Sequence, residues 1–132
     1  MITFIKWLAI QAIVWTLAVA GGHYWLHEEP RRILIGIDAS FPMNRDWQAV
    51  RERVDALAAR SRYSEFAVVT GKSRVHGWRD KPAMDGVVTY GPRHLDRITD
   101  PTRYPEIEQA DKRVLITNAE GADIDGWDVL RP

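Results

Sequence analysis

The chain has 132 residues, its 18 lysines and arginines balance its 18 aspartates and glutamates, and it contains no cysteine. The lack of cysteine excludes disulfide bonds, thiolate nucleophiles and zinc–thiolate centres. Zero net charge argues against a general electrostatic attraction to nucleic acid, so we expect no nucleic-acid partner. The length leaves room for one globular domain.

An uncharged apolar segment lies near the amino terminus. Residues 7–26 read WLAIQAIVWTLAVAGGHYWL and contain no Asp, Glu, Lys or Arg. A helix of this length spans about 30 Å at 1.5 Å per residue, which matches the hydrocarbon core of a bilayer. Trp7 at one end and Tyr24 and Trp25 at the other are amphipathic aromatics typical of the membrane–water interface. The segment therefore predicts a single transmembrane helix.

The same segment can also be interpreted as a cleaved signal peptide. Lys6 then supplies the basic n-region, and Ala18-Val19-Ala20 supplies an A-x-A cleavage site. Apolar and aromatic residues continue past that site to Leu26, which favours a retained anchor. A short tail, one apolar helix and then a long domain are the layout of a signal anchor. We therefore expect a single-pass protein of the inner (cytoplasmic) membrane with its domain in the periplasm.

Small residues on the predicted helix offer a surface on which another helix can pack. Ala18 and Gly22 are four positions apart and therefore share one face. Gln11 and Thr16 carry hydrogen-bonding groups at membrane depth, where protein is a better neighbour than lipid. These residues predict other integral membrane subunits as partners.

The chain divides into a tail and anchor over residues 1–29 and a small domain over residues 30–132. In the domain, Trp47, Val50, Val54 and Leu57 recur at spacings of three and four and predict an amphipathic helix. We further expect Asn44 to cap that helix, strands over 33–38, 65–70, 74–78, 87–90, 113–117 and 127–130, and short helices over 95–98 and 105–110. This order predicts an α/β fold with a small, partly parallel sheet flanked by helices.

Two strand ends carry short polar motifs. The first apolar strand ends in Asp38-Ala39-Ser40, and a later strand runs into Thr117-Asn118-Ala119. Together with the helix and hairpin between them, these motifs resemble a truncated, degenerate von Willebrand factor type A domain over about residues 32–130. In that family, D-x-S-x-S, T-D-G and a distant threonine hold a divalent cation that a partner's carboxylate completes. The resemblance places Asp38, Ser40 and Asn118 at ligand positions.

Several residues depart from that metal-binding pattern. Pro42 replaces the second serine, Asn118 replaces the aspartate and Ala119 replaces the glycine. A hard cation needs several oxygen ligands, preferably anionic, and only Asp38 supplies a charge here. We therefore expect no metal and no other cofactor. Weak Mg²⁺ or Ca²⁺ binding at Asp38, Ser40 and Asn118 is the alternative.

No catalytic motif is evident in the domain. Ser40 follows a strand but does not lie in a G-x-S-x-G turn, and no glycine-rich phosphate loop occurs. We therefore expect no enzymatic activity and no small-molecule substrate.

Large aromatic residues near turns are the remaining candidates for binding. Trp78 and Trp127 lie at predicted strand ends, so we expect them to contact partners. The sequence as a whole predicts a non-catalytic accessory or assembly subunit of a larger membrane protein complex. The alternative is a metal-dependent, adhesion-type binding module that recognises a partner's carboxylate.

Overall fold

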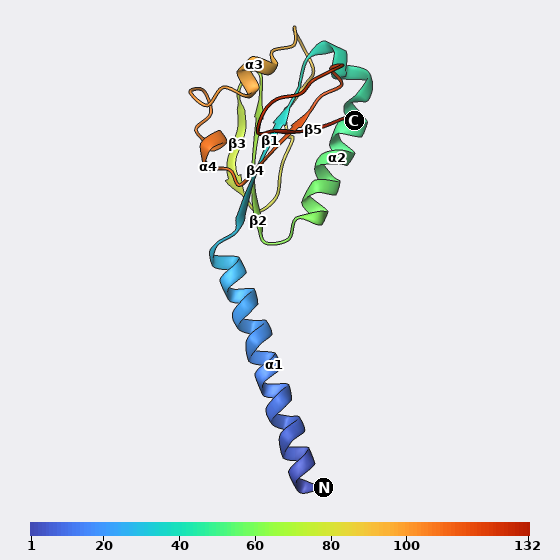
Figure 1. The fold of residues 1–132 in the computed structure, drawn as a ribbon. Helices are drawn as coiled ribbons and strands as arrows, with labels where there is room; N and C mark the ends of the chain where they lie inside the picture. Colours follow the sequence, from blue (N-terminus) through green and yellow to red (C-terminus); the bar gives the residue numbers. More distant parts are fainter. The chain divides into compact units, whose positions relative to one another are not determined.

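The computed structural model describes the whole chain, residues 1–132. The chain divides into two compact units, Met1–Pro30 and Arg31–Pro132. The first unit consists of helix α1 (Ile2–Glu28), and the second is an α/β domain (Figure 1).

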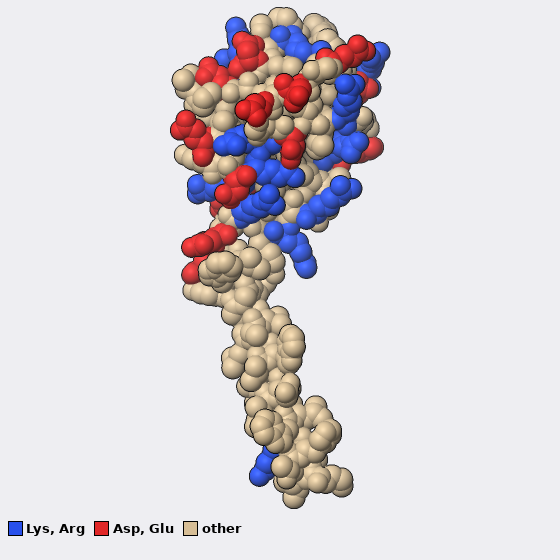
Figure 2. All heavy atoms as spheres, viewed as in Figure 1, with Lys and Arg blue, Asp and Glu red and all other residues tan.

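Helix α1 is continuous over 27 residues, and none of them is buried. In the space-filling view its surface is almost free of charge, whereas acidic and basic side chains intermingle on the visible face of the domain (Figure 2). The helix is long and apolar enough to cross a membrane. The predicted helix is therefore confirmed, and it extends beyond residues 7–26 at both ends.

Five strands form one mixed sheet in the order β3-β2-β1-β4-β5. Their bounds are β1 (Arg31–Ile37), β2 (Ser64–Thr70), β3 (Arg74–Arg79), β4 (Lys112–Ile116) and β5 (Asp128–Leu130). Strand β1 pairs in parallel with β2 and β4, β4 pairs in parallel with β5, and β2 and β3 form an antiparallel hairpin. The partly parallel α/β fold is therefore confirmed.

The two faces of the sheet carry separate hydrophobic cores. Successive side chains of a strand point to opposite faces, so Ile33 and Ile35 belong to one core and Leu34 to the other. The first core is completed by Val50 and Val54 of α2 (Trp47–Arg60). The second is covered by two short helices, α3 (Leu95–Ile98) and α4 (Glu106–Gln109), which lie across the sheet from α2 (Figure 1). Burial on both faces explains the unbroken apolar run of β1.

The expected strand over 87–90 is wrong, because these residues form a loop. Val87 packs against the core that α2 covers, so the apolar run contributes to packing and not to strand pairing. The backbone N–H of Tyr90 donates to Ala39 O at 3.0 Å, which holds this loop beside the segment that follows β1.

The expected N-cap of α2, Asn44, is also wrong. Asn44 lies inside a 3₁₀ helix, η1 (Phe41–Asp46), and α2 begins only at Trp47. Pro42 explains the early start, since its fixed φ angle suits the first turn of a helix. The Asn44 side chain instead accepts a hydrogen bond from Thr89 Oγ1 at 2.9 Å.

Gly36 provides a test of the packing between the sheet and α3. A Cβ atom at Gly36 would lie 2.6 Å from Ile98 Cγ2 and 3.1 Å from Trp127 Cζ3. We predict that Gly36→Ala lowers the free energy of unfolding by about 1–3 kcal/mol, because the core must shift to admit the methyl group. Chemical denaturation of the full chain in detergent measures the change.

Gly77→Ala in β3 is the matched control, since no atom lies within 4 Å of a Cβ atom there. Its expected effect is below about 0.5 kcal/mol. Equal stability of the two variants would contradict the packing described here.

Candidate functional site

Polar residues gather where the two central strands end. Strand β1 runs into Asp38 and Ser40, and β4 runs into Thr117 and Asn118. Because β1 and β4 are parallel neighbours, their carboxyl ends lie at the same edge of the sheet. We define the carboxyl-edge site as these four residues together with Arg93.

The Asp38 carboxylate is buried at the centre of this site, with only 2% of the residue exposed. Its Oδ2 accepts hydrogen bonds from Thr117 Oγ1 and from Arg93 Nε, each at 2.7 Å. Its Oδ1 accepts a hydrogen bond from the backbone N–H of Ser40 at 3.2 Å. A buried charge is very costly unless it is paired and hydrogen-bonded. The guanidinium of Arg93 supplies the opposite charge.

Asn118 connects the carboxyl-edge site to η1. Its Oδ1 accepts a hydrogen bond from Arg93 Nη2. Its Nδ2 donates to Pro42 O and to Asp46 Oδ2, both at 2.8 Å. Since arginine only donates and the other two oxygens only accept, these partners fix the orientation of the amide. The side chain therefore has internal partners for both its oxygen and its nitrogen.

Ser40 differs from its neighbours, because its buried Oγ has no hydrogen-bond partner within the protein. A cavity of about 10 Å³ adjoins it, lined in part by Lys72 and His94. That volume is close to the minimum that one water molecule needs. The cavity is therefore too small for a divalent cation with its own shell of water.

The structure brings the predicted ligands Asp38, Ser40 and Asn118 together, but the site they form does not fit a divalent cation. Asp38 Oδ2 and Asn118 Oδ1 already accept hydrogen bonds from the guanidinium of Arg93, and Asp38 Oδ1 accepts one from the backbone N–H of Ser40. A dication placed beside that group would be repelled, and few oxygen ligands would remain for it. No group of three or more His, Asp or Glu side chains in the chain could hold a metal ion.

Sequence patterns did not identify Arg93. It lies in the irregular segment Gly91-Pro92-Arg93, 55 residues from Asp38, so no local pattern links the two. Proximity to Asp38 arises only when the sheet forms. The one available signal was that a lone aspartate at a buried strand end needs a cation from elsewhere in the chain.

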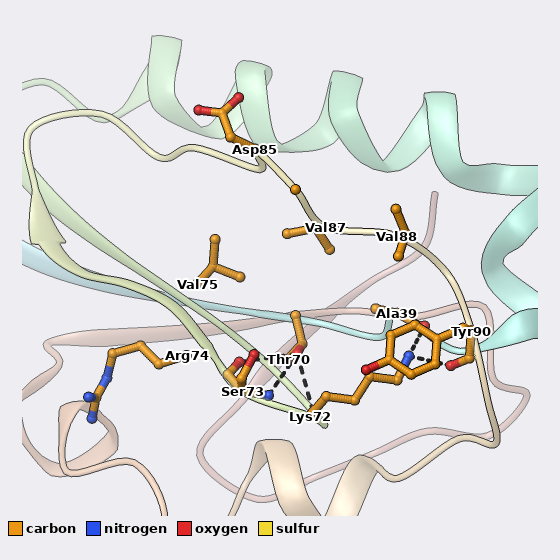
Figure 3. A pocket seen from close by; sticks show the side chains of 11 residues that line it. Ala39, Thr70, Lys72, Ser73, Arg74, Val75, Asp85, Val87, Val88 and Tyr90 are labelled. Atoms are coloured by element: carbon orange, nitrogen blue, oxygen red, sulfur yellow. Dashed lines mark hydrogen bonds between the residues drawn. The ribbon is translucent and has the colours of Figure 1, made fainter.

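Lys72 fastens the loop that precedes Arg93 to the end of β1. Its Nζ donates to Ala39 O at 2.7 Å and to the carbonyl oxygen of Tyr90, and it lies 3.2 Å from the centroid of the Tyr90 ring (Figure 3). Burial lowers the pKa of Lys72, and the nearby charge of Asp38 opposes this shift. The loop and the β2–β3 hairpin line an open pocket of about 270 Å³.

The two tryptophans that were expected to contact partners, Trp78 and Trp127, are half-buried and buried, respectively. Trp127 is 9% exposed and belongs to the core beneath α3 and α4, so little of its side chain is accessible and its role as a partner contact stays a prediction. The cause of its burial is that β5 pairs with β4 and extends the sheet, so that Trp127, which immediately precedes β5, lies against the face covered by α3 and α4. Trp78 is half-buried, donates from Nε1 to Gln109 Oε1 at 2.9 Å, and lies 5.4 Å from the guanidinium of Arg32.

Three exposed apolar side chains of the domain lie on segments near the carboxyl edge of the sheet. Phe41, Val88 and Tyr90 are 66%, 62% and 53% exposed, and they are the exposed large hydrophobic residues of this unit. The N–H of Phe41 donates to Gly91 O at 3.1 Å, so the start of η1 adjoins the loop that carries Val88 and Tyr90. We call these three residues the apolar loop patch. Sequence patterns did not identify it, because Val88 and Tyr90 were assigned to a strand.

The predicted contact residues of α1 are all exposed within their unit. Trp7 lies near one end of the helix, and Tyr24 and Trp25 lie near the other. A side chain at Gly22 would meet no atom within 4 Å, so Ala18 and Gly22 present an open face. The hydroxyl of Thr16 donates to Ala12 O at 2.8 Å and needs no partner from another helix.

Lys72→Met tests how firmly the loop is fastened. The substitution removes the donor to two carbonyl oxygens, so we predict a loss of about 1–2 kcal/mol in the free energy of unfolding. Lys81→Met is the control, because Lys81 is exposed. Chemical denaturation of the full chain measures both, and equal stabilities would show that Lys72 does not fasten the loop.

The chain was also compared with protein-family models, with curated proteins and with solved structures. None of these comparisons gave a match. The likeness to a von Willebrand factor type A domain therefore stays a prediction from the motifs at Asp38 and Asn118.

Proposed function

We propose that this chain is a non-catalytic accessory or assembly subunit of a larger membrane protein complex. Helix α1 anchors it, and the apolar loop patch docks on partner subunits. The patch is the observation that carries the proposal, because Phe41, Val88 and Tyr90 are each more than half exposed on adjoining segments. Large apolar side chains exposed near one another are typical of protein contact sites.

Helix α1 supports the membrane part of the proposal. It is long and apolar enough to span a bilayer, and it continues past Ala20, the end of the A-x-A motif, to Glu28. A cleaved signal peptide would need no such continuation. We propose a retained single-pass anchor in the inner membrane, with the domain in the periplasm, and a partner helix packed on Ala18 and Gly22.

We also propose that the domain is a degenerate relative of the von Willebrand factor type A domain. Its central parallel strands end in Asp38 and Asn118 at one sheet edge, which supports the relation. The metal-dependent binding module is the less favoured function, because the guanidinium of Arg93 takes up the oxygens that a cation would need.

The double variant Phe41→Ser/Val88→Ser tests the docking surface. The full chain with a carboxyl-terminal tag is extracted gently from its native membranes and sized under native conditions, and the co-purifying subunits are quantified by mass spectrometry. We predict that the wild type runs as an assembly and that the variant recovers its partners at least about tenfold less well, as expected when exposed anchors are removed.

Arg51→Ser/Ala59→Ser is the matched control, since both residues are exposed on α2 and neither belongs to the apolar loop patch. It should recover the partners as well as the wild type does. Recovery of the wild-type chain only as a free monomer, or equal recovery by both double variants, would contradict the proposed docking surface.

A further inference from the structure

We infer that the guanidinium of Arg93 is the built-in cation of the carboxyl-edge site and makes the domain independent of divalent metal. This role of Arg93 holds whether or not the chain docks on partner subunits, since it involves only residues of the domain itself.

The position of the guanidinium is the first support. It bridges the ends of two adjacent parallel strands, with Nε bonded to Asp38 Oδ2 after β1 and Nη2 bonded to Asn118 Oδ1 after β4. These two oxygens are the ones that the sequence motifs offer to a metal ion. Arginine provides a fork of fixed donors, so one side chain can hold both strand ends together.

The burial of the pair is the second support. The side chain of Asp38 is 2% exposed and that of Arg93 is 28% exposed, so the carboxylate is buried and the arginine that pairs with it is mostly buried. Removing one partner of such a pair leaves a buried charge uncompensated, and this is far more damaging than removing both.

Lys72 is the other cation near Asp38, but it is not the partner of this carboxylate. Its Nζ donates to the carbonyl oxygens of Ala39 and Tyr90. Only Arg93 lies within salt-bridge distance of Asp38. The charge of Asp38 is therefore neutralised mainly from the loop that follows Tyr90.

Covalent attachment gives Arg93 an advantage over a free ion. Gly91, with a φ of +72°, turns the chain just before Arg93. The guanidinium is thereby tethered beside Asp38, and its effective concentration does not vary with the metal content of the compartment. A divalent cation would have to displace this tethered charge before it could bind.

Thermal unfolding of the full chain in mild detergent, followed by near-ultraviolet circular dichroism, tests the inference. The wild-type Tm should be the same with EDTA, millimolar MgCl₂ or millimolar CaCl₂, and calorimetry should detect no saturable binding of either ion. Arg93→Met should lower the Tm by roughly 10 °C, because it leaves Asp38 unpaired. Asp38→Asn/Arg93→Met should regain at least about half of that loss, since the buried charge is gone.

Arg97→Met is the matched control, because Arg97 is exposed on α3 four positions further on. It should leave the Tm within about 2 °C of the wild type. Saturable metal binding by the wild type, or equal Tm values for Arg93→Met and Arg97→Met, would overturn the inference. If Arg93→Met alone does not fold, a cooperative transition regained in the double variant supports the inference, and failure to regain it overturns the inference.

Discussion

A carboxylate buried at the end of a central strand must be neutralised from within the protein. The loops at this edge of the domain supply the groups that do so. Asp38 receives its counter-charge from Arg93, and the same guanidinium binds Asn118 beyond β4. Asn118 then holds η1 through Asp46. Lys72 fastens the loop that leads to Arg93. One buried charge thus ties together two strand ends, a 3₁₀ helix and a long loop.

The sequence was sufficient for the features that depend on local patterns. The apolar runs of β1 and β4 and the stripe of α2 predicted the elements, and the resemblance to a von Willebrand factor type A domain placed Asp38 and Asn118 at one site. It failed where distant parts of the chain decide the outcome. Arg93 meets Asp38 across 55 positions, and residues 87–90 form a loop because Val87 is used for packing. Such contacts have no periodicity to read.

In the proposed function, the carboxyl-edge site and the apolar loop patch have different roles. The ion pair of Asp38 and Arg93 stabilises the loops at this edge. Phe41, Val88 and Tyr90 supply the exposed surface that contacts partners. A membrane anchor would restrict the search for partners to two dimensions and raise their effective concentration. A patch of only three large apolar residues could then hold a complex that it could not hold between freely diffusing proteins.

The arrangement of the carboxyl edge depends on the neutralisation of Asp38 by Arg93. The most direct measurement is a ¹H–¹⁵N NMR spectrum of the arginine Nε–H groups in the full chain, recorded in detergent micelles with and without millimolar Mg²⁺. We expect a slowly exchanging Nε–H signal that is lost in Arg93→Lys and in Asp38→Asn and is unchanged by Mg²⁺. Rapid exchange of the Arg93 signal in the wild type, or its displacement by Mg²⁺, would show that Arg93 is not the fixed counter-charge of Asp38.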